Sequence, residues 1–457
     1  MADDTLIEED RYELDKSAVA AIVEAAEAGD AVRLARLMEP MHAADIADLL
    51  EQVDEDERRA ILKLFEPEFD GEILSEIDES IRDAVIAALS PEVLSDAVRE
   101  LESDDVVDII EDLEAPQQEA ILGALEISDR IAVEQALTYP EFSAGRLMQR
   151  EIVAGPEYWT VGEAIDYLRQ RDDLPEEFYH MILVDPRMRP TGYVTLGKIL
   201  SHRRDVKLAD ITEDSFRTID AMEDEGEVAY AFNQYHLISA PVVEEDGRLV
   251  GVITIDDAMA VLDEEHEEDI LRLAGVSDES SLADRVIATT KRRFPWLAVN
   301  LVTAVLASLV IAVYEDAIAQ LVALAVLMPI VASMGGNAGT QSLTVAVRAI
   351  ATKDLTGSNV WRVIRREALV GLVNGVLFAV VMGVVGVIWF GSTALGLVIA
   401  AAMVINLVVA GLAGTVIPVA LERLRIDPAL ASGAFVTTVT DVVGFFAFLG
   451  LAAAVLL

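Results

Sequence analysis

The sequence contains no cysteine, which excludes disulfide bonds, thiolate catalysis and zinc sites built from cysteine. Two enzyme motifs are also missing. There is no phosphate-binding Gly-Lys-Ser loop, and the segment His266-Glu-Glu-Asp-Ile270 has isoleucine where a zinc protease needs a second histidine. We therefore expect that the protein is not an enzyme. The first ten residues lack the basic and apolar regions of a signal peptide, so the first membrane span is expected to direct insertion.

Basic residues are few, and they are unevenly spread. The 457 residues include 34 Lys and Arg against 80 Asp and Glu, a net charge of −46. Ten basic and seven acidic residues lie from Lys291 onward, which leaves 24 basic and 73 acidic residues, a net of −49, in residues 1–290. So acidic a segment argues against nucleic-acid binding. It suits divalent cations, although a soluble or salt-adapted surface would explain part of the same excess.

Long apolar segments dominate the remaining residues. Five are long enough to span a bilayer, at about 294–313, 317–347, 368–390, 394–421 and 429–456. All ten basic residues of this part fall on one side of these spans, which the positive-inside rule assigns to the cytoplasm. We therefore expect a multi-pass protein of the plasma (inner) membrane with a cytoplasmic N-terminus and an outside C-terminus. Five is an odd number of spans, so a simple internal duplication does not explain it. A pore on a two-fold axis between two identical chains would explain it.

Asp441 is an acidic residue in the middle of the last apolar segment. It lies 13 residues beyond Pro428, which places it roughly 20 Å into the bilayer at 1.5 Å per residue. A carboxylate at that depth costs at least ~2.5 kcal/mol and by default faces a pore or cavity. A hydrogen bond between packed helices is the alternative interpretation.

The second span carries polar and helix-weakening residues. Pro329 removes a helix hydrogen bond, and the glycines that follow it permit either close helix approach or a local break. Asn337 and Gln341 present amide groups one turn apart, and broken helices at membrane depth are tolerated where they line a water-filled path. The fourth span repeats this pattern with Asn406 and Pro418.

The acidic part divides into two patterns. Residues 18–135 read as short helices with a repeat, because Ala44-Asp-Ile-Ala-Asp-Leu-Leu50 recurs 60 residues later as Asp104-Asp-Val-Val-Asp-Ile-Ile110. Residues 140–263 alternate strands and helices, and Gly192-Tyr-Val-Thr-Leu196 recurs as Gly251-Val-Ile-Thr-Ile255. The turn Glu245-Asp-Gly247 predicts a hairpin. The second pattern resembles a pair of CBS domains.

The segment 256–290 joins the acidic part to the spans. Asp263, Glu264, Glu267 and Glu268 crowd about a turn and a half of expected helix, where their repulsion is unfavourable unless cations intervene. A solvated acidic helix is the alternative interpretation.

Taken together, these features resemble the MgtE family of magnesium transporters and channels. The resemblance rests on Pro329 with Gly335-Gly-Asn-Ala-Gly-Thr-Gln341, on Thr437 with Asp441, and on the order of the domains, and it covers nearly the whole chain. It implies a multidomain membrane protein that assembles as a homodimer. The parts are an α-helical superhelix (18–135), CBS domain 1 (136–200), CBS domain 2 (201–263), a plug helix (256–290) and a five-helix transmembrane domain (291–457).

The resemblance also implies a function for particular residues. In the family the ion path follows the dimer axis, and the aspartate that matches Asp441 binds hydrated Mg²⁺ from both subunits. The candidates for lining the pore are Gly335, Gly336, Asn337, Gln341, Asn406 and Thr437. High cytosolic Mg²⁺ closes the path by binding among carboxylates whose matches here are Glu72, Asp104, Asp108, Glu225, Asp256, Glu264, Glu267, Glu268 and Asp427.

CBS pairs often bind adenine nucleotides such as ATP through a Gly-x-x-Thr/Ser-x-x-Asp motif. The second half has this motif, with Thr254 and Asp257 in register, whereas the first half has Lys198 where aspartate is expected. The alternative is that Thr254 and Asp257 simply cap a helix N-terminus.

Other functions stay open at this point. The same pore would also suit Mn²⁺ or Co²⁺. A membrane-tethered CBS sensor that transports nothing is a further alternative. Asp441 argues against it, because a sensor needs no carboxylate inside a span. The expected partners are a second copy of the chain, membrane lipid and divalent cations.

Overall fold

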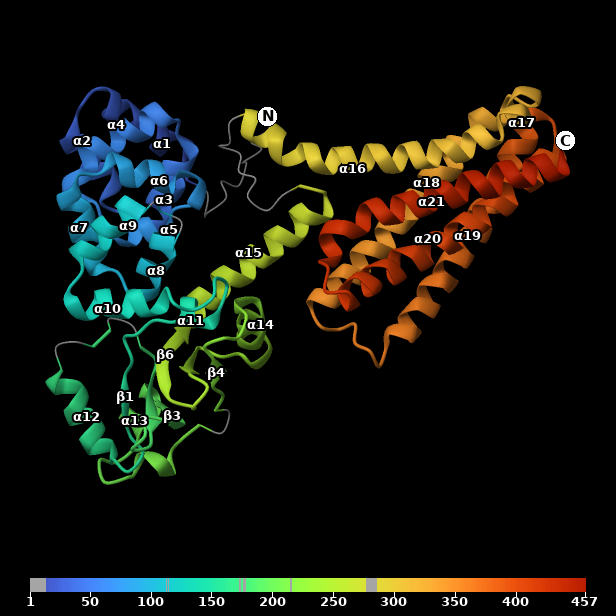
Figure 1. Cartoon of the computed structure of the whole chain (residues 1–457). Helices are drawn as coiled ribbons and strands as arrows, with labels where there is room; N and C mark the ends of the chain where they lie inside the picture. The colour runs from blue at the N-terminus through green and yellow to red at the C-terminus, as the bar shows by residue number, and fades with distance from the viewer. Residues whose placement is uncertain are drawn as a thin grey trace, which may run out of the picture. The chain divides into compact units, whose positions relative to one another are not determined.

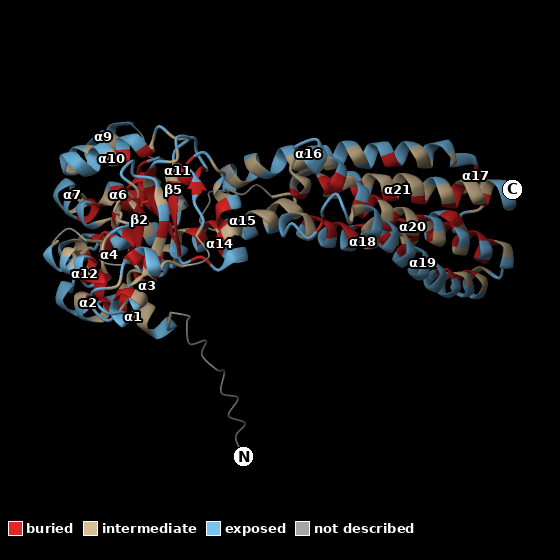
Figure 2. Ribbon diagram, turned by 90° about the horizontal axis from the view of Figure 1, so that it is seen from below, coloured by how far each residue is buried: buried red, intermediate tan, exposed pale blue. Residues whose placement is uncertain are grey.

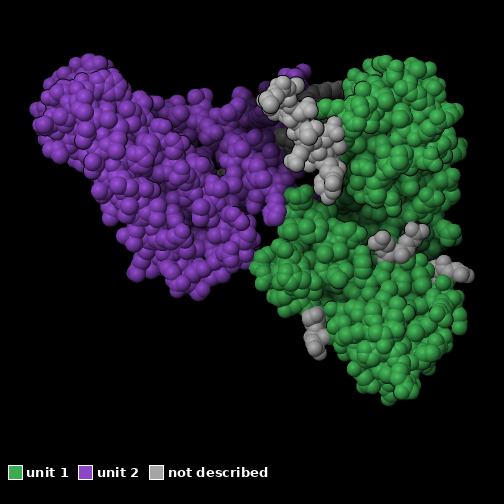
Figure 3. Space-filling view, turned by 180° about the vertical axis from the view of Figure 1, so that it is seen from behind, with its two compact units in different colours: residues 1–263 green, residues 264–457 purple. Residues whose placement is uncertain are grey.

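The computed structural model describes residues 14–457 except 112, 114, 172–173, 176–177, 214–215 and 277–285. The chain divides into two compact units, Met1–Asp263 and Glu264–Leu457, which Figure 3 shows in different colours. The expectation about the first ten residues, and the middle of the predicted connecting segment 256–290, lie outside the described residues.

The first unit begins with a stack of short helices (Figure 1). Aspartates at several N-termini accept hydrogen bonds from free backbone N–H groups: Asp15 from Ser17, Asp30 from Arg33 and Asp54 from Asp56 and Glu57. The elements are α1 (Lys16–Glu27), α2 (Ala31–Met38), α3 (Ala43–Gln52), α4 (Glu55–Phe65), η1 (Glu66–Glu68), α5 (Glu72–Glu76), α6 (Glu79–Ala88), α7 (Pro91–Glu100), α8 (Ser103–Glu111), α9 (Ala115–Ala124) and α10 (Ile127–Ala136).

The sequence repeat corresponds to pairs of helices in this stack. Ala44–Leu50 lies in α3 and its copy Asp104–Ile110 in α8. A second short segment, Ala60-Ile-Leu62, recurs with the same offset as Ala120-Ile-Leu122, and these two copies lie in α4 and α9. Ile46 and Leu50 in α3, like Val106 and Ile110 in α8, belong to one shared apolar core. The helical repeat was therefore predicted correctly.

Two small sheets follow, and each has its own core. In both, a parallel pair of strands is extended by an antiparallel hairpin, in the orders β1-β2-β3 and β4-β5-β6. The elements are α11 (Ala144–Leu147), β1 (Ala154–Pro156), α12 (Val161–Gln170), β2 (His180–Val184), β3 (Pro190–Thr195), α13 (Leu196–Ser201), η2 (Leu208–Asp210), β4 (Ile219–Asp220), α14 (Glu225–Tyr235), β5 (Ser239–Val243), β6 (Leu249–Thr254) and α15 (Ile255–Leu273).

The two sheets are copies of one another in detail. The register shifts between Leu183 and Val184 in the first sheet and between Val242 and Val243 in the second. The predicted hairpin is confirmed, since Gly247 has a left-handed φ of 78° in the turn between β5 and β6. The two-residue strand β4 and the three-residue strand β1 were missed, because such short segments show no alternating pattern.

The second unit is a bundle of long helices. Its elements are α16 (Val286–Val313), α17 (Glu315–Gln320), α18 (Ala323–Ala351), α19 (Val360–Phe390), α20 (Thr393–Arg423) and α21 (Pro428–Val455). Five helices of the described residues are long and apolar enough to cross a membrane. Helix α20 packs against α18, α19 and α21, whereas α16 packs on α21 and is largely exposed (Figure 2).

The second predicted span needs a correction. The expected segment 317–347 starts within a separate short helix, α17, and the main helix α18 begins only at Ala323. Helix α18 then continues without a break through Pro329 and the glycines to Ala351. Gly335 and Gly339 are buried, and a Cβ atom on either would overlap a neighbouring helix. Of the two alternatives for these glycines, close packing is therefore the one observed.

Candidate functional site

Asp441 lies in the middle of α21, where its side chain is half-buried. Thr437, one turn earlier on the same face, is exposed, and its hydroxyl donates to the carbonyl of Gly433 at 2.9 Å. Among the described residues, none forms a hydrogen bond or an ion pair with the Asp441 carboxylate. In the described part of the chain, the alternative of a hydrogen bond between packed helices therefore has no partner residue to support it.

Helix α18 lies against α21 and has a polar face of its own. Asn337 and Gln341 are exposed one turn apart, and Gly336 is half-buried. Gly335 and Gly339 point inward instead, and a Cβ atom on Gly339 would come within 2.7 Å of Val436 Cγ1 on α21. The glycines thus bring the two polar helices close together, with the amide groups of α18 left outside the packed core.

Asn406 differs from the expectation that it lines a pore. It is 0% exposed, and its Nδ2 donates to the carbonyl of Val331 on α18 at 2.8 Å. A Cβ atom on Gly335, or on Gly444 of α21, would overlap the Asn406 amide. Asn406 therefore links α20 to α18 by a hydrogen bond and packs closely against α21. Glycine at positions 335 and 444 leaves room for its side chain on both neighbours.

A second carboxylate inside the bundle was missed. Glu367 of α19 is 8% exposed, and its Oε2 accepts a 3.0 Å hydrogen bond from Ser342 of α18. Gly411 and Gly414 of α20 face Glu367 and Ser342, where a Cβ atom would overlap the backbone of Glu367 and of Gly339. The two glycines allow the carboxylate to reach past α20. Its position just after Arg362, Arg365 and Arg366 made it look like an interfacial residue.

In the first unit, carboxylates gather where the start of α8 meets the segment before β1. Ser103 Oγ donates to Glu151 Oε2 at 2.8 Å and accepts from the backbone N–H of Arg150 at 2.8 Å. Gln149 donates from its side-chain amide to Glu102. These bonds join the helical stack to the tandem sheets, and we call the surrounding residues Glu102, Asp104, Asp105, Glu151, Asp256 and Asp257 the acidic junction.

Two carboxylates of the acidic junction lie side by side. Asp104 is 7% exposed and lies beside Asp257, which accepts from Thr254 Oγ1 at 2.7 Å. Burial raises the pKa of Asp104 well above its usual range and raises the pKa of Asp257 as well. Each charge makes the other carboxylate harder to ionise, which adds to the cost of burying both.

The pKa values of two neighbouring carboxyl groups, those of Glu102 and Asp105, are raised as well. Burial first, and then the charge of Glu151, raise the pKa of Glu102 to about 7. Burial and the charge of Asp257 raise the pKa of Asp105 to about 7. A cation would relieve both effects, because it offsets the repulsion and replaces the lost water.

The predicted regulatory ligands are only partly brought together. Asp104 and Asp256 belong to the acidic junction, and Asp257 joins them although it was assigned to nucleotide. Asp108 lies one turn beyond Asp104, where Arg82, itself 6% exposed, forms an ion pair with its Oδ2 at 2.9 Å. Glu72 is exposed, and Glu76, one turn later on α5, is among the charges that raise the pKa of Asp105.

The other predicted ligands lie elsewhere. Glu225 begins α14, where its backbone N–H donates to the carbonyl of Phe142. Glu264 and Glu267 are exposed on α15, and Glu268 pairs with Arg272 at 2.8 Å. Asp427 caps α21 by accepting from the N–H of Ala429. In the described part of the chain, no three His, Asp or Glu side chains are grouped closely enough to hold a metal ion in this conformation.

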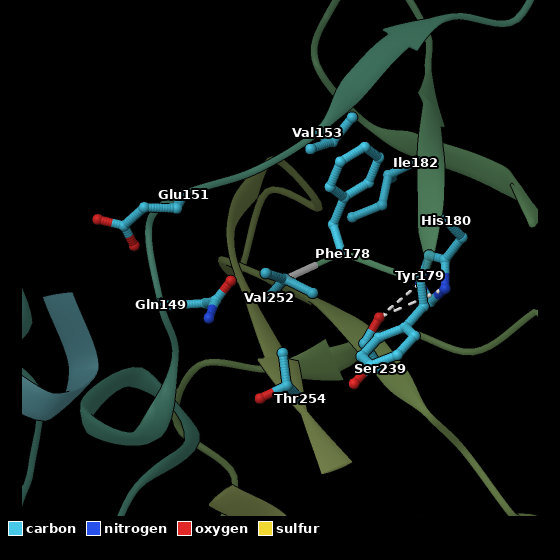
Figure 4. Close-up of a pocket in the computed structure, with 10 residues that line it drawn as sticks. All are labelled: Gln149, Glu151, Val153, Phe178, Tyr179, His180, Ile182, Ser239, Val252 and Thr254. Atoms are coloured by element: carbon cyan, nitrogen blue, oxygen red, sulfur yellow. Dashed lines mark hydrogen bonds between the residues drawn. The ribbon is translucent and has the colours of Figure 1, made fainter. Parts of the chain in front are cut away.

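The cleft between the two sheets contains a small cavity (Figure 4). Ser239 pairs in register with Thr254, and the hydroxyl of Ser239 lies 2.6 Å from His180 Nε2. Burial lowers the pKa of His180 to about 4, so the ring is neutral at pH 7. The cavity of about 20 Å³ has room for about one water molecule. The cavity is therefore too small for a nucleotide in this conformation, and of the two residues predicted to bind nucleotide only Thr254 lines it.

Comparisons with known proteins agree with this architecture. Three family models match: a divalent cation transporter over residues 328–451, an MgtE intracellular N domain over 41–142 and a CBS domain over 208–264. The long apolar helices support a multi-pass membrane protein, and the transporter match makes its membrane part similar to divalent cation transporters.

Curated relatives and solved structures add detail. The chain is 31% identical over 444 residues to a magnesium transporter MgtE of Thermus thermophilus, which covers 96% of this chain and 98% of that one. A magnesium transporter MgtE of Bacillus subtilis is 31% identical over 358 residues, covering 78% and 79%. The chain therefore belongs to the MgtE family of magnesium transporters, which are not enzymes. It is also similar to a solved cytosolic domain of the Mg²⁺ channel MgtE in complex with ATP, with 28% identity, a TM-score of 0.49, and coverage of 53% and 99%.

Proposed function

We propose that this chain forms a Mg²⁺-selective path across the plasma (inner) membrane, with the Asp441 carboxylates of two identical subunits binding a hydrated ion. The observation that carries this proposal is the Asp441 carboxylate itself, which is half-buried in an apolar helix and has no partner among the described residues. An ion with its water shell supplies the missing partner, since Mg²⁺ gives up water reluctantly and needs only one or two carboxylates.

The polar face of α18 supports the same path. The side chains of Asn337 and Gln341 are exposed on a helix that packs against α21, and they offer oxygen atoms and N–H groups to a hydrated ion. Exposed amides on a membrane helix are costly against lipid, which favours a water-filled path or a second subunit as their neighbour. A two-fold axis would place both copies of Asp441 around one ion.

We further propose that cytosolic Mg²⁺ closes this path by binding to carboxylates of the acidic part. The support is the acidic junction, where burial and mutual repulsion raise the pKa values of four carboxyls. Without a cation these groups must hold protons or separate. Mg²⁺ favours the closed state only if it binds that state more tightly, and apposed carboxylates provide such a difference.

The test of transport uses Asp441→Ala and Asp441→Asn, measured as Mg²⁺ uptake by a strain deficient in Mg²⁺ uptake. We expect Asp441→Ala to abolish uptake and Asp441→Asn to retain at most a small fraction, because an amide oxygen is a ligand without charge. Asp316→Asn, an exposed acidic residue of α17, is the matched control and should transport normally. Normal uptake by Asp441→Ala at equal membrane abundance would refute the assignment. Uptake of Mn²⁺ or Co²⁺ at the same rate as Mg²⁺ would refute the selectivity.

A further inference from the structure

The end of helix α15 is attached to the start of helix α21 by an arginine. Arg272 Nη2 lies 2.8 Å from Glu268 Oε2 on its own helix, and Arg272 Nη1 lies 3.2 Å from Asp427 Oδ2. Asp427 is the N-cap of α21, and its other oxygen accepts from the Ala429 N–H at 2.7 Å. One guanidinium therefore bridges two carboxylates that lie on different helices.

Apolar contacts hold the same end of α15. Leu273, the residue after Arg272, packs in a cluster with Leu343 and Val347 of α18 and with Ala429 and Val436 of α21. Both helices of the proposed ion path thus meet the last turn of α15. An ion pair beside such a cluster is partly shielded from water, with Arg272 26% and Asp427 33% exposed.

The charges around Arg272 explain why a cation is needed there. Asp269 is half-buried beside Glu268 on α15, close to the two carboxylates that Arg272 bridges. Glu268, Asp269 and Asp427 would repel one another without a positive charge between them. The guanidinium suits this position because its planar fork can donate to two carboxylates at once.

We propose that Arg272 is a built-in latch that holds α15 on the first turn of α21 without any metal, and that it thereby sets the Mg²⁺ concentration at which the path closes. This inference rests on the proposed function. Asp256 and Asp257 of the acidic junction lie at the start of α15, and Arg272 lies near its end. The arginine therefore supplies in advance part of the interaction that holds this helix in the closed state. Less cytosolic Mg²⁺ is then needed to complete closure.

The first experiment measures Mg²⁺ currents through purified full-length protein in planar bilayers as the cytosolic-side Mg²⁺ concentration is varied. We expect Arg272→Gln to raise the concentration for half-closure about three- to tenfold, in line with a partly buried ion pair. Arg272→Lys keeps the charge without the fork and should give a smaller increase. The matched control is Arg423→Gln, which removes an exposed cation at the end of α20. An unchanged or lower concentration for Arg272→Gln would overturn the latch.

The second experiment is independent of transport and of Mg²⁺. Because the chain has no cysteine, spin labels can be attached specifically to cysteines introduced at Ile270 and Leu424, which are 69% and 68% exposed. In excess chelator we expect a narrow distribution of label distances in the labelled protein that retains Arg272 and in its Arg423→Gln variant. The distribution should be broad in the Arg272→Gln variant. A distribution that stays narrow in Arg272→Gln would refute the latch, whatever the currents show. Broadening in protein that conducts no Mg²⁺ would support the latch and contradict the proposed function instead.

Discussion

At the scale of single residues, the bundle contains two carboxylates whose surroundings are opposite. Glu367 is buried and accepts a hydrogen bond from Ser342, so its role lies within the packing of one chain. Asp441 is half-buried and has no such partner among the described residues. A charge inside a membrane bundle is retained where it is paired or where it meets ions. Glu367 is the paired carboxylate, and Asp441 is the one that we propose meets ions.

We predict that Glu367 positions α18 through Ser342. Glu367→Ala should lower the free energy of unfolding by about 1–3 kcal/mol, because it leaves a buried hydroxyl without its acceptor. Glu367→Gln keeps an acceptor and should cost less than about 1 kcal/mol. Thermal unfolding in detergent and Mg²⁺ uptake at equal membrane abundance are the measurements.

Ser342→Ala and Thr415→Ala make a matched pair for this prediction. Both remove a buried hydroxyl, but Thr415 bonds only within its own helix, to Gly411. If the link between helices matters, Ser342→Ala should impair uptake more than Thr415→Ala, and should add little to Glu367→Ala. Equal effects of the two hydroxyl deletions would contradict a positioning role.

Single residues also show what could be predicted before the structure was known. Asp441 stands out because a charge within a long uncharged segment is visible in the sequence alone. The contact between Asp104 and Asp257 is different, because only the fold brings α8 to the start of α15. Motif spacing assigned Asp257 to a nucleotide site, and the family resemblance assigned Asp108 to a metal site. Neither could show that Asp104 lies beside Asp257 or that Arg82 pairs with Asp108.

At the scale of elements, helix α18 is held by glycines rather than broken by them. Its buried glycines recur on the face toward α20 and α21, while its amides lie on another face. The sequence predicted a helix with weak points but could not decide between a break and close packing. The decision depends on Asn406, whose amide occupies the space that a side chain at Gly335 would need.

We predict that Gly335→Ala destabilises the bundle and Gly336→Ala does not. A methyl group at Gly335 would overlap the Asn406 amide, which cannot move because it is fully buried and bonded to Val331. Nothing lies within 4 Å of a Cβ atom at Gly336. Overpacking of this kind costs typically about 1–3 kcal/mol. Thermal unfolding in detergent measures the difference, and similar melting temperatures for the two variants would contradict the packing described for α18.

At the scale of the whole molecule, the dominant property is the excess of negative charge in residues 1–290. Sequence composition predicted that excess and the separation between an acidic part and an apolar part. It could not predict where the charge is most unfavourable, since most acidic residues lie on exposed helix faces. The acidic junction is the exception, because the helical stack and the tandem sheets bury its carboxylates together.

We predict that, without divalent metal, the acidic part loses stability as the pH rises from about 4 to about 7. Glu102 and Asp105 have pKa values of about 7 in the folded chain, against ordinary values of 4.5 and 3.8. At a pH between the ordinary and the folded pKa values, the folded state therefore binds more protons than the unfolded state. The stabilisation is complete at a pH below the ordinary pKa values and is lost as the pH rises through the folded pKa values of about 7. Each group contributes roughly 1 kcal/mol or more. The measurement is resistance to proteolysis of residues 1–290 in the full-length protein, in chelator, at pH 5.5 and pH 8.

Millimolar Mg²⁺ should remove most of this pH dependence, because the ion takes over the role of the protons and protects the acidic part at pH 8. Asp104→Asn should weaken that protection, since it replaces a carboxyl group, which can give up its proton to the ion, by a neutral amide at the centre of the acidic junction. Glu39→Gln, at an exposed position of the same helical stack, is its control and should leave protection unchanged. A monovalent salt at matched ionic strength screens charge without bridging carboxylates. If that salt protected the chain at pH 8 as well as Mg²⁺ does, plain screening would account for the effect, and the acidic junction would not be a specific Mg²⁺ site.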